Sequence, residues 1–173
     1  MTVLGKMQDL ARAKVLAYSG TPAAAPAKTA PAATTPAAKH RAALKAKQDA
    51  DALVASVSFA DEDLRGYMLS YGGTPTYVYT ASAGPDKDGA VRYVSVVAQA
   101  DGLGDLKEAM SSVTDALHLD RTPRFRLVDV VDVEASNRAS LLVELRAQHS
   151  RQFALYRVIG AQSQQMFTTG STQ

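Results

Sequence analysis

Short runs of Val, Tyr, Leu and Phe recur through the second half of the chain and are separated by turn-forming clusters. β-branched and aromatic residues favour strands, and clusters of Gly, Pro, Asp and Asn favour turns. The spacing indicates hairpins rather than crossovers, so we predict an all-β or β-rich antiparallel meander, propeller-blade-like or a sandwich, over residues 59–170. The expected strands lie at residues 74–82, 91–100, 125–133, 140–147 and 152–160.

Two further segments bear on this meander. Leu106, Met110, Val113 and Leu117 fit a helical spacing, whereas the turn at residues 100–105 favours a returning strand for the first half of this segment. The hairpin over residues 144–158 is expected to leave an edge strand open. An open edge invites strand addition and self-association.

The N-terminal part is expected to be a short helix followed by a disordered linker. In residues 1–19, Leu4, Met7, Ala11, Val15 and Tyr18 recur at three- and four-residue steps, which predicts an amphipathic helix. Its apolar stripe could pack on the body, on a second subunit or on a preceding domain. Four of the seven prolines fall in the Ala-rich residues 20–38, so we expect an extended linker there, with a marginal helix up to residue 58.

Composition restricts the class of protein. The 173 residues are 46% hydrophobic and 21% charged, and no apolar run approaches the roughly 20 residues of a membrane-spanning helix. There is no cysteine, which excludes disulfides, thiolate metal sites and cysteine nucleophiles. Residues 1–58 carry eight Lys or Arg against three acidic residues, whereas residues 59–173 carry eleven against fourteen. A basic tail therefore precedes a mildly acidic body.

The N-terminus lacks the continuous apolar core of a secretory signal. We therefore expect a cytoplasmic location if this N-terminus is native. A periplasmic or extracellular location is expected if the sequence is part of a longer or processed chain.

One loop has the frame of a calcium site. Asp132, Glu134 and Ser136 occupy alternate positions between two apolar strands, and oxygen ligands at alternate positions of a tight loop suit calcium. Ala135 and Asn137 stand where such loops carry glycine, and Ser140 replaces the closing acid. These departures favour a turn whose Asp and Asn side chains bond the loop backbone. Calcium is the one cofactor that these residues suggest.

The same stretch resembles the FG-GAP or VCBS type of repeat, in which an acidic loop joins the first two strands of a hairpin unit and a leucine begins the next strand. Residues 124–158 are also similar to the C-terminal part of bacterial, especially acidobacterial, exported proteins of unknown function. The resemblance implies a β-blade architecture with a degenerate calcium loop, placed outside the cytoplasm. It implies no particular reaction.

Other charged residues carry no catalytic pattern. The acidic turns at residues 85–89 and 101–105 are turn signatures rather than metal or phosphate loops. The three histidines do not have the spacing of a zinc site or a catalytic triad. Carboxylates considered as general acids are Glu108, Asp115 and Asp120. We expect a protein that is not an enzyme.

One basic-aromatic patch stands out in the body. Strand alternation places Arg124 and Arg126 on one face and Phe125 on the other, so the charged face would lack an aromatic residue on which a nucleic-acid base could stack. Ion pairs to Asp129, Asp132 or Glu144 are the simpler account of these arginines.

The sequence thus favours a non-enzymatic structural or protein-interaction module of an exported bacterial protein, held on a linker and able to self-associate. The alternative is a protein that binds nucleic acid or another polyanion through its basic N-terminal tail. Nucleic acid is the less favoured partner, and no membrane span is expected.

Overall fold

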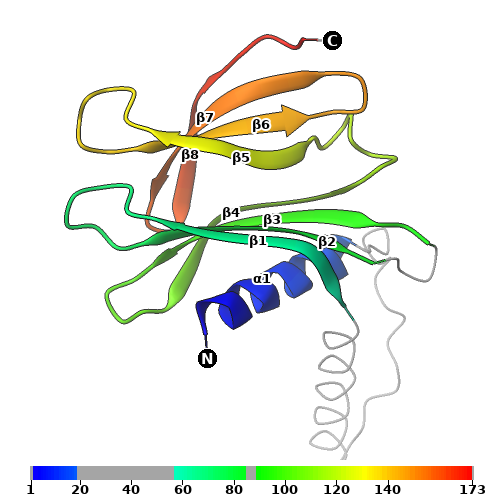
Figure 1. Ribbon diagram of the computed structural model, residues 1–173, viewed down its shortest axis with the longest axis horizontal. Coiled ribbons are helices and arrows are strands. Elements are labelled where there is room, and N and C mark those ends of the chain that lie inside the picture. Colours follow the sequence, from blue (N-terminus) through cyan, green and yellow to red (C-terminus); the bar gives the residue numbers. More distant parts are fainter. Residues whose placement is uncertain (1, 19–56, 85–88, 173) are drawn as a thin grey trace, which may run out of the picture.

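The structure, a computed structural model, describes residues 2–18, 57–84 and 89–172. The predicted linker and marginal helix, residues 20–58, fall almost wholly outside them. Within the described residues there are one helix and eight strands (Figure 1): α1 (Val3–Tyr18), β1 (Phe59–Tyr67), β2 (Thr76–Ala83), β3 (Arg92–Ala100), β4 (Leu106–Asp115), β5 (Arg124–Val131), β6 (Ser140–Arg146), β7 (Arg151–Ile159) and β8 (Gln162–Thr168).

The strands form two four-stranded antiparallel meanders. The first sheet has the order β1-β2-β3-β4 and the second sheet has the order β5-β6-β7-β8. Figure 1 shows the second sheet on one side of the first sheet and α1 on the other. The predicted β-rich antiparallel meander is confirmed. The helix in the described residues, α1, is not long and apolar enough to cross a membrane.

Two local expectations are decided by the pairing. Residues 106–115 form strand β4 against β3 and not a helix, and Leu117 of the supposed helical stripe is exposed in the following turn. The prediction that the hairpin at residues 144–158 leaves an edge open is wrong, because β6 and β7 are both internal strands of the second sheet. Its open edges are β5 and β8 instead.

The first sheet is covered on both faces because its central strands alternate two sets of apolar side chains. Tyr79 of β2 and Val96 of β3 are buried in the cluster that includes α1. Val78 of β2 and Val97 of β3 belong to a second cluster with β5, β6 and β7 of the second sheet. Successive strand residues point to opposite faces, so one pair of strands serves both interfaces.

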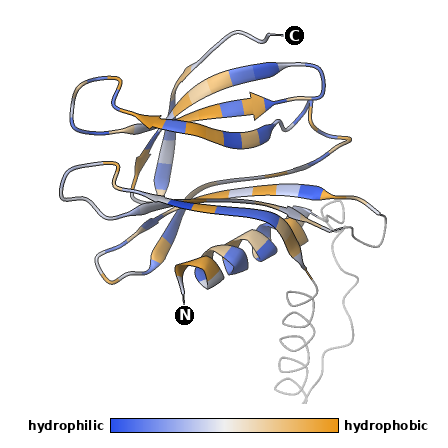
Figure 2. Ribbon diagram, in the orientation of Figure 1, coloured by the Kyte–Doolittle hydropathy of each residue, from blue (hydrophilic) through white to orange (hydrophobic). Residues whose placement is uncertain are grey.

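Helix α1 packs on the body through one stripe. Thr2 caps the helix, since its Oγ1 accepts a hydrogen bond of 3.2 Å from the backbone nitrogen of Gly5. Met7, Ala11 and Val15 recur at helical spacing and are buried against the first sheet. Of the partners considered for the predicted helix, the body is therefore the one that the structure shows. Figure 2 shows hydrophilic residues of α1 alternating with hydrophobic ones.

A carboxylate links the helix to the sheet. Glu62 of β1 accepts hydrogen bonds of 2.7 Å from Nε2 of Gln8 and from the hydroxyl of the buried Tyr79. Donation by Gln8 and then by Tyr79 lowers the pKa of Glu62 below its usual value. Burial, followed by the hydrogen bond to Glu62, raises the pKa of Tyr79.

We expect Met7→Ala to destabilise the protein by about 2–4 kcal/mol, because a fully buried side chain is lost and a cavity remains between α1 and the first sheet. Leu4 of the same helix is 40% exposed, so Leu4→Ala is the matched control and should cost less than about 1 kcal/mol. Urea unfolding of both variants measures the difference. Equal losses would contradict the packing described for α1.

We expect Glu62→Gln to change the pH dependence of stability. The folded state favours ionised Glu62, so its contribution is complete above the unfolded pKa of about 4.3 and is lost as the pH falls through the lower folded pKa. The difference in the free energy of unfolding between the parent and the variant should be constant above about pH 5.5 and should shrink below about pH 4. A difference that grows on acidification would contradict this assignment.

Candidate functional site

The loop between β5 and β6 is organised around the carboxylate of Asp132. Oδ1 accepts hydrogen bonds from the backbone nitrogens of Glu134 (3.3 Å) and Ser136 (3.1 Å). Oδ2 accepts one of 2.8 Å from the backbone nitrogen of Asn137. Asp132 therefore bonds the loop backbone, as the turn alternative predicts for Asp, whereas Asn137 takes part through its backbone nitrogen.

The other features of the calcium frame divide into two groups. Ala135 and Asn137, at the two glycine positions, have left-handed φ values of 50° and 58°, so the backbone keeps the bend of such loops. The side chains are used differently, because Glu134 forms an ion pair with Arg157 of β7 and Ser136 is exposed. No cluster of three or more His, Asp or Glu residues able to hold a metal lies in residues 2–18, 57–84 and 89–172. Calcium binding stays a prediction, and it would require Glu134 to leave Arg157.

The carboxylates considered for catalysis have structural partners. Asp115 lies 2.7 Å from Nδ1 of His118 and accepts a hydrogen bond of 3.1 Å from the hydroxyl of Tyr18 at the end of α1. Although partial burial acts to raise the pKa of Asp115, hydrogen bonds from His118, from the backbone of Leu117 and from Tyr18 hold it below its usual value. This cluster anchors the C-terminal end of α1.

Glu108 and Asp120 are also engaged. Glu108 pairs with Lys14 of α1 at 2.7 Å, and Asp120 accepts a hydrogen bond of 3.0 Å from the backbone nitrogen of Gln148. None of these carboxylates lines the large cleft described next.

An open cleft of about 850 Å³ is lined by β1, β2 and β3 of the first sheet and by β5, β6 and β7 of the second sheet. The alternation of β5 forms part of its wall. Phe125 and Leu127 are buried in the cluster between the sheets, and Arg124 and Arg126 are on the opposite face, exposed to the cleft. The face predicted from sequence for these two arginines is therefore correct.

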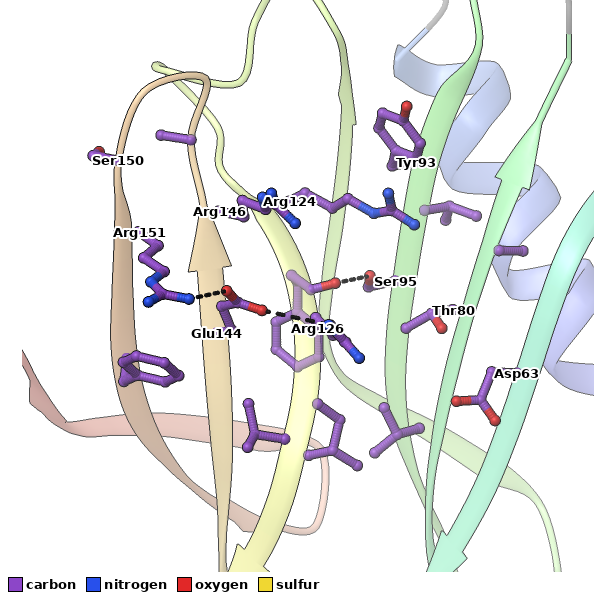
Figure 3. A pocket seen from close by; sticks show the side chains of 18 of the residues that line it. Asp63, Thr80, Tyr93, Ser95, Arg124, Arg126, Glu144, Arg146, Ser150 and Arg151 are labelled. Carbon is purple, nitrogen blue, oxygen red and sulfur yellow. Dashed lines mark hydrogen bonds and ion pairs between the residues drawn. The ribbon is translucent and has the colours of Figure 1, made fainter. Parts of the chain in front are cut away.

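Strand register places three arginines side by side in this wall. Arg124 of β5 lies directly opposite Arg146 of β6, and Arg146 lies directly opposite Arg151 of β7. We call these three residues the arginine row (Figure 3). Like charges at directly opposed positions of an antiparallel pair destabilise a sheet. The sheet thus carries this row at a cost in stability.

Neighbouring acids offset only part of this charge. Glu144 is nearly buried and lies 3.8 Å from Arg126 and 3.9 Å from Arg151, distances too long for hydrogen bonds. Arg146 makes no ion pair with any residue that the structure describes. The guanidinium of Arg124 lies over the ring of Tyr93, 4.1 Å from its centre. Arg146, at the middle of the row, is the arginine best placed to take a further anion.

The other wall of the cleft comes from the first sheet. The hydroxyl of Ser95 donates a hydrogen bond of 3.3 Å to the backbone oxygen of Phe125, which joins β3 to β5. Tyr93 and Phe153 also line the cleft, so aromatic residues do lie on its charged side. The sequence-based expectation that this side would lack an aromatic neighbour is wrong, because both residues come from other strands than β5.

The cleft concentrates positive charge on an otherwise acidic body. Its walls carry five arginines against the carboxylates of Asp63 and Glu144, a balance of +3, whereas residues 59–173 as a whole have eleven basic and fourteen acidic residues. The five are Arg65, Arg124, Arg126, Arg146 and Arg151. Guanidinium groups bind carboxylate and phosphate oxygens through paired hydrogen bonds. The arrangement can therefore bind anions.

Sequence reasoning identified Arg124 and Arg126 but not Arg146 and Arg151. The signal for the missing pair is the register of β6 and β7, in which a turn of four residues, 147–150, places Arg146 opposite Arg151.

No family model, curated protein or solved structure matches the chain.

We expect Ala135→Gly to stabilise the protein by about 0.5–1 kcal/mol, because relief of the left-handed strain of an L-residue exceeds the entropy cost of glycine. Ala116 is exposed in another turn and its φ is not positive, so Ala116→Gly is the matched control and should be neutral or destabilising. Thermal and urea unfolding measure both. Destabilisation by Ala135→Gly would contradict the loop conformation.

Proposed function

We propose that this protein is a non-enzymatic interaction module that binds a short acidic segment of a protein partner in the cleft that the arginine row lines. The observation that carries the proposal is the arginine row. In it Arg146 lies opposite Arg124 on one side and Arg151 on the other, and the cleft has fewer carboxylates than arginines. Clusters of arginine are a common means of recognising acidic or phosphorylated motifs. A bound anion would also relieve the repulsion within the row.

The length of the row supports a short ligand. Three neighbouring strands span about 10 Å, and acidic side chains on one face of an extended peptide recur about every 7 Å. The row therefore suits two carboxylates. A long polyanion that continued across the cleft would meet Asp63 of β1, whose carboxylate is already paired with Arg65 at 2.9 Å. The short length of the row therefore favours a short acidic peptide over nucleic acid.

The resemblance of residues 124–158 to bacterial exported proteins supports an interaction role and a location outside the cytoplasm. Such repeats are structural and interaction units without a shared reaction, and an FG-GAP or VCBS-like unit places its acidic loop between the first two strands of a meander. Here the loop at residues 132–138 lies between β5 and β6 of the second sheet. On these grounds we propose that the module acts outside the cytoplasm.

Binding of a fluorescent peptide with alternating glutamates to the full chain at low salt tests the proposal. We expect Arg146→Gln to weaken binding about tenfold, because a charge-assisted hydrogen bond of about 1.5 kcal/mol is lost. The same substitution should keep or raise the free energy of unfolding by up to about 1 kcal/mol, because a like-charge contact is removed. Loss of binding with no loss of stability separates ligand recognition from folding.

Arg138→Gln is the matched control, since Arg138 is exposed in the loop between β5 and β6, outside the cleft, and pairs with no described carboxylate. It removes the same charge and should leave peptide affinity within about twofold. The proposal is overturned if the parent chain does not bind the peptide at low salt. It is also overturned if single-stranded DNA binds more tightly and Arg146→Gln does not affect it, which would favour the basic N-terminal tail.

A further inference from the structure

The two sheets have four edge strands, and three of them carry charges of the kind that discourages strand addition. Charged side chains on an edge strand prevent unwanted pairing with another chain. β1 contains Asp61, Glu62, Asp63 and Arg65. The other two charged edges are β4, with Lys107, Glu108 and Asp115, and β5, with Arg124, Arg126 and Asp129.

β8 is the exception. Its sequence, QSQQMFT, contains no charged residue and no proline, and the uncharged stretch continues to Thr172, which pairs with Arg151 of β7. Met166 is 39% exposed and Phe167 is 57% exposed. All four edges contain one register shift, so a bulge does not distinguish β8 from the others. The absence of charged residues is what distinguishes β8 from the other three edge strands.

The outer side of β8 has no ladder. β8 pairs with β7 on its inner side, and it lies near β4 of the first sheet without a backbone hydrogen bond to β4 in the part of the chain that the structure describes. Unpaired backbone groups of an edge strand are a template for another strand.

We propose that β8 pairs with β8 of a second copy of this chain in an antiparallel, two-fold symmetric contact. In a two-fold antiparallel contact the residue at the axis faces its own copy, so a charge there meets a like charge, and a charge elsewhere on the strand needs an opposite charge at the mirrored position. β8 meets this requirement because it has none. Gln162 and Gln164 are also self-complementary, since a glutamine amide both donates and accepts hydrogen bonds. Oε1 of Gln165 accepts a hydrogen bond of 3.0 Å from the hydroxyl of Tyr156 within the same sheet.

This pairing would join the two second sheets into one continuous sheet. The two-fold axis of an antiparallel strand pair is perpendicular to the sheet, so both copies present the same face on the same side. The arginine rows of the two copies would therefore lie on one side of the assembly. A partner with two acidic segments could then bind both rows and gain affinity through effective concentration. The pairing itself rests on β8 and does not depend on what the cleft binds.

Sedimentation equilibrium and light scattering of the full chain, from about 1 µM to 1 mM, test the pairing. We expect a monomer–dimer equilibrium that Gln164→Lys with Gln165→Lys weakens at least tenfold. The matching double variant with Glu at both positions should be weakened similarly. Mixing the Lys and Glu variants should restore a dimer that contains one copy of each. Circular dichroism and urea unfolding of both variants establish that the fold is kept.

The control places two lysines on exposed loop residues elsewhere, Leu103→Lys with Leu117→Lys, which are 92% and 86% exposed in the parent. These should leave the dimer affinity within about twofold. A strict monomer over the whole concentration range overturns the proposal. A dimer that survives the β8 variants, or one that the Leu103 and Leu117 variants abolish, overturns it as well, because the contact would then lie elsewhere.

Discussion

The alternation of β2 and β3 is the constraint on which the rest of the structure depends. Tyr79 and Val96 bury one face of the first sheet under α1, and Val78 and Val97 bury the other against the second sheet. A sheet with both faces covered needs two separate covers, which accounts for the N-terminal helix and for the second meander. Hydrogen bonds from Gln8 and Tyr79 to Glu62 then hold the helix at its place on the sheet.

The second sheet differs because the structure covers one of its faces with the apolar cluster, while the opposite face of β5, β6 and β7 lines the cleft. On a face that is not needed for the core, selection for packing does not restrict the side chains. That face carries arginines at directly opposed positions, although such pairs destabilise a sheet. Local violations of stabilising rules are expected at sites that serve function rather than folding.

Much of the fold could be predicted from residue types. The strands rich in Val, Tyr, Leu and Phe became β2, β3, β5, β6 and β7. Met7, Ala11 and Val15 of the predicted stripe of α1 are buried, whereas Leu4 is 40% exposed. β1 and β8 were not predicted, because an acidic run and a glutamine-rich run have low strand propensity and form strands only through pairing with β2 and β7. Residues 106–115 satisfied both periodicities, and pairing with β3 decided between them. The left-handed conformation of Ala135 did not follow from residue type, because alanine adopts it less readily than the glycine of such loops. The ion pair of Glu134 with Arg157 was not predicted either, since Arg157 belongs to another strand.

By itself, the sequence determined the β-rich class, the apolar stripe of α1, most of the strands and the face on which Arg124 and Arg126 lie, because each depends on propensities and periodicities within one segment. Only the tertiary structure decided which strands are edges and which arginines stand together. Arg146 and Arg151 join Arg124 through the registers of two strand pairs, and β8 is an edge because no strand pairs with its outer side in the described residues. Strand register and strand order arise from contacts between distant segments, so residue patterns within one segment do not specify them.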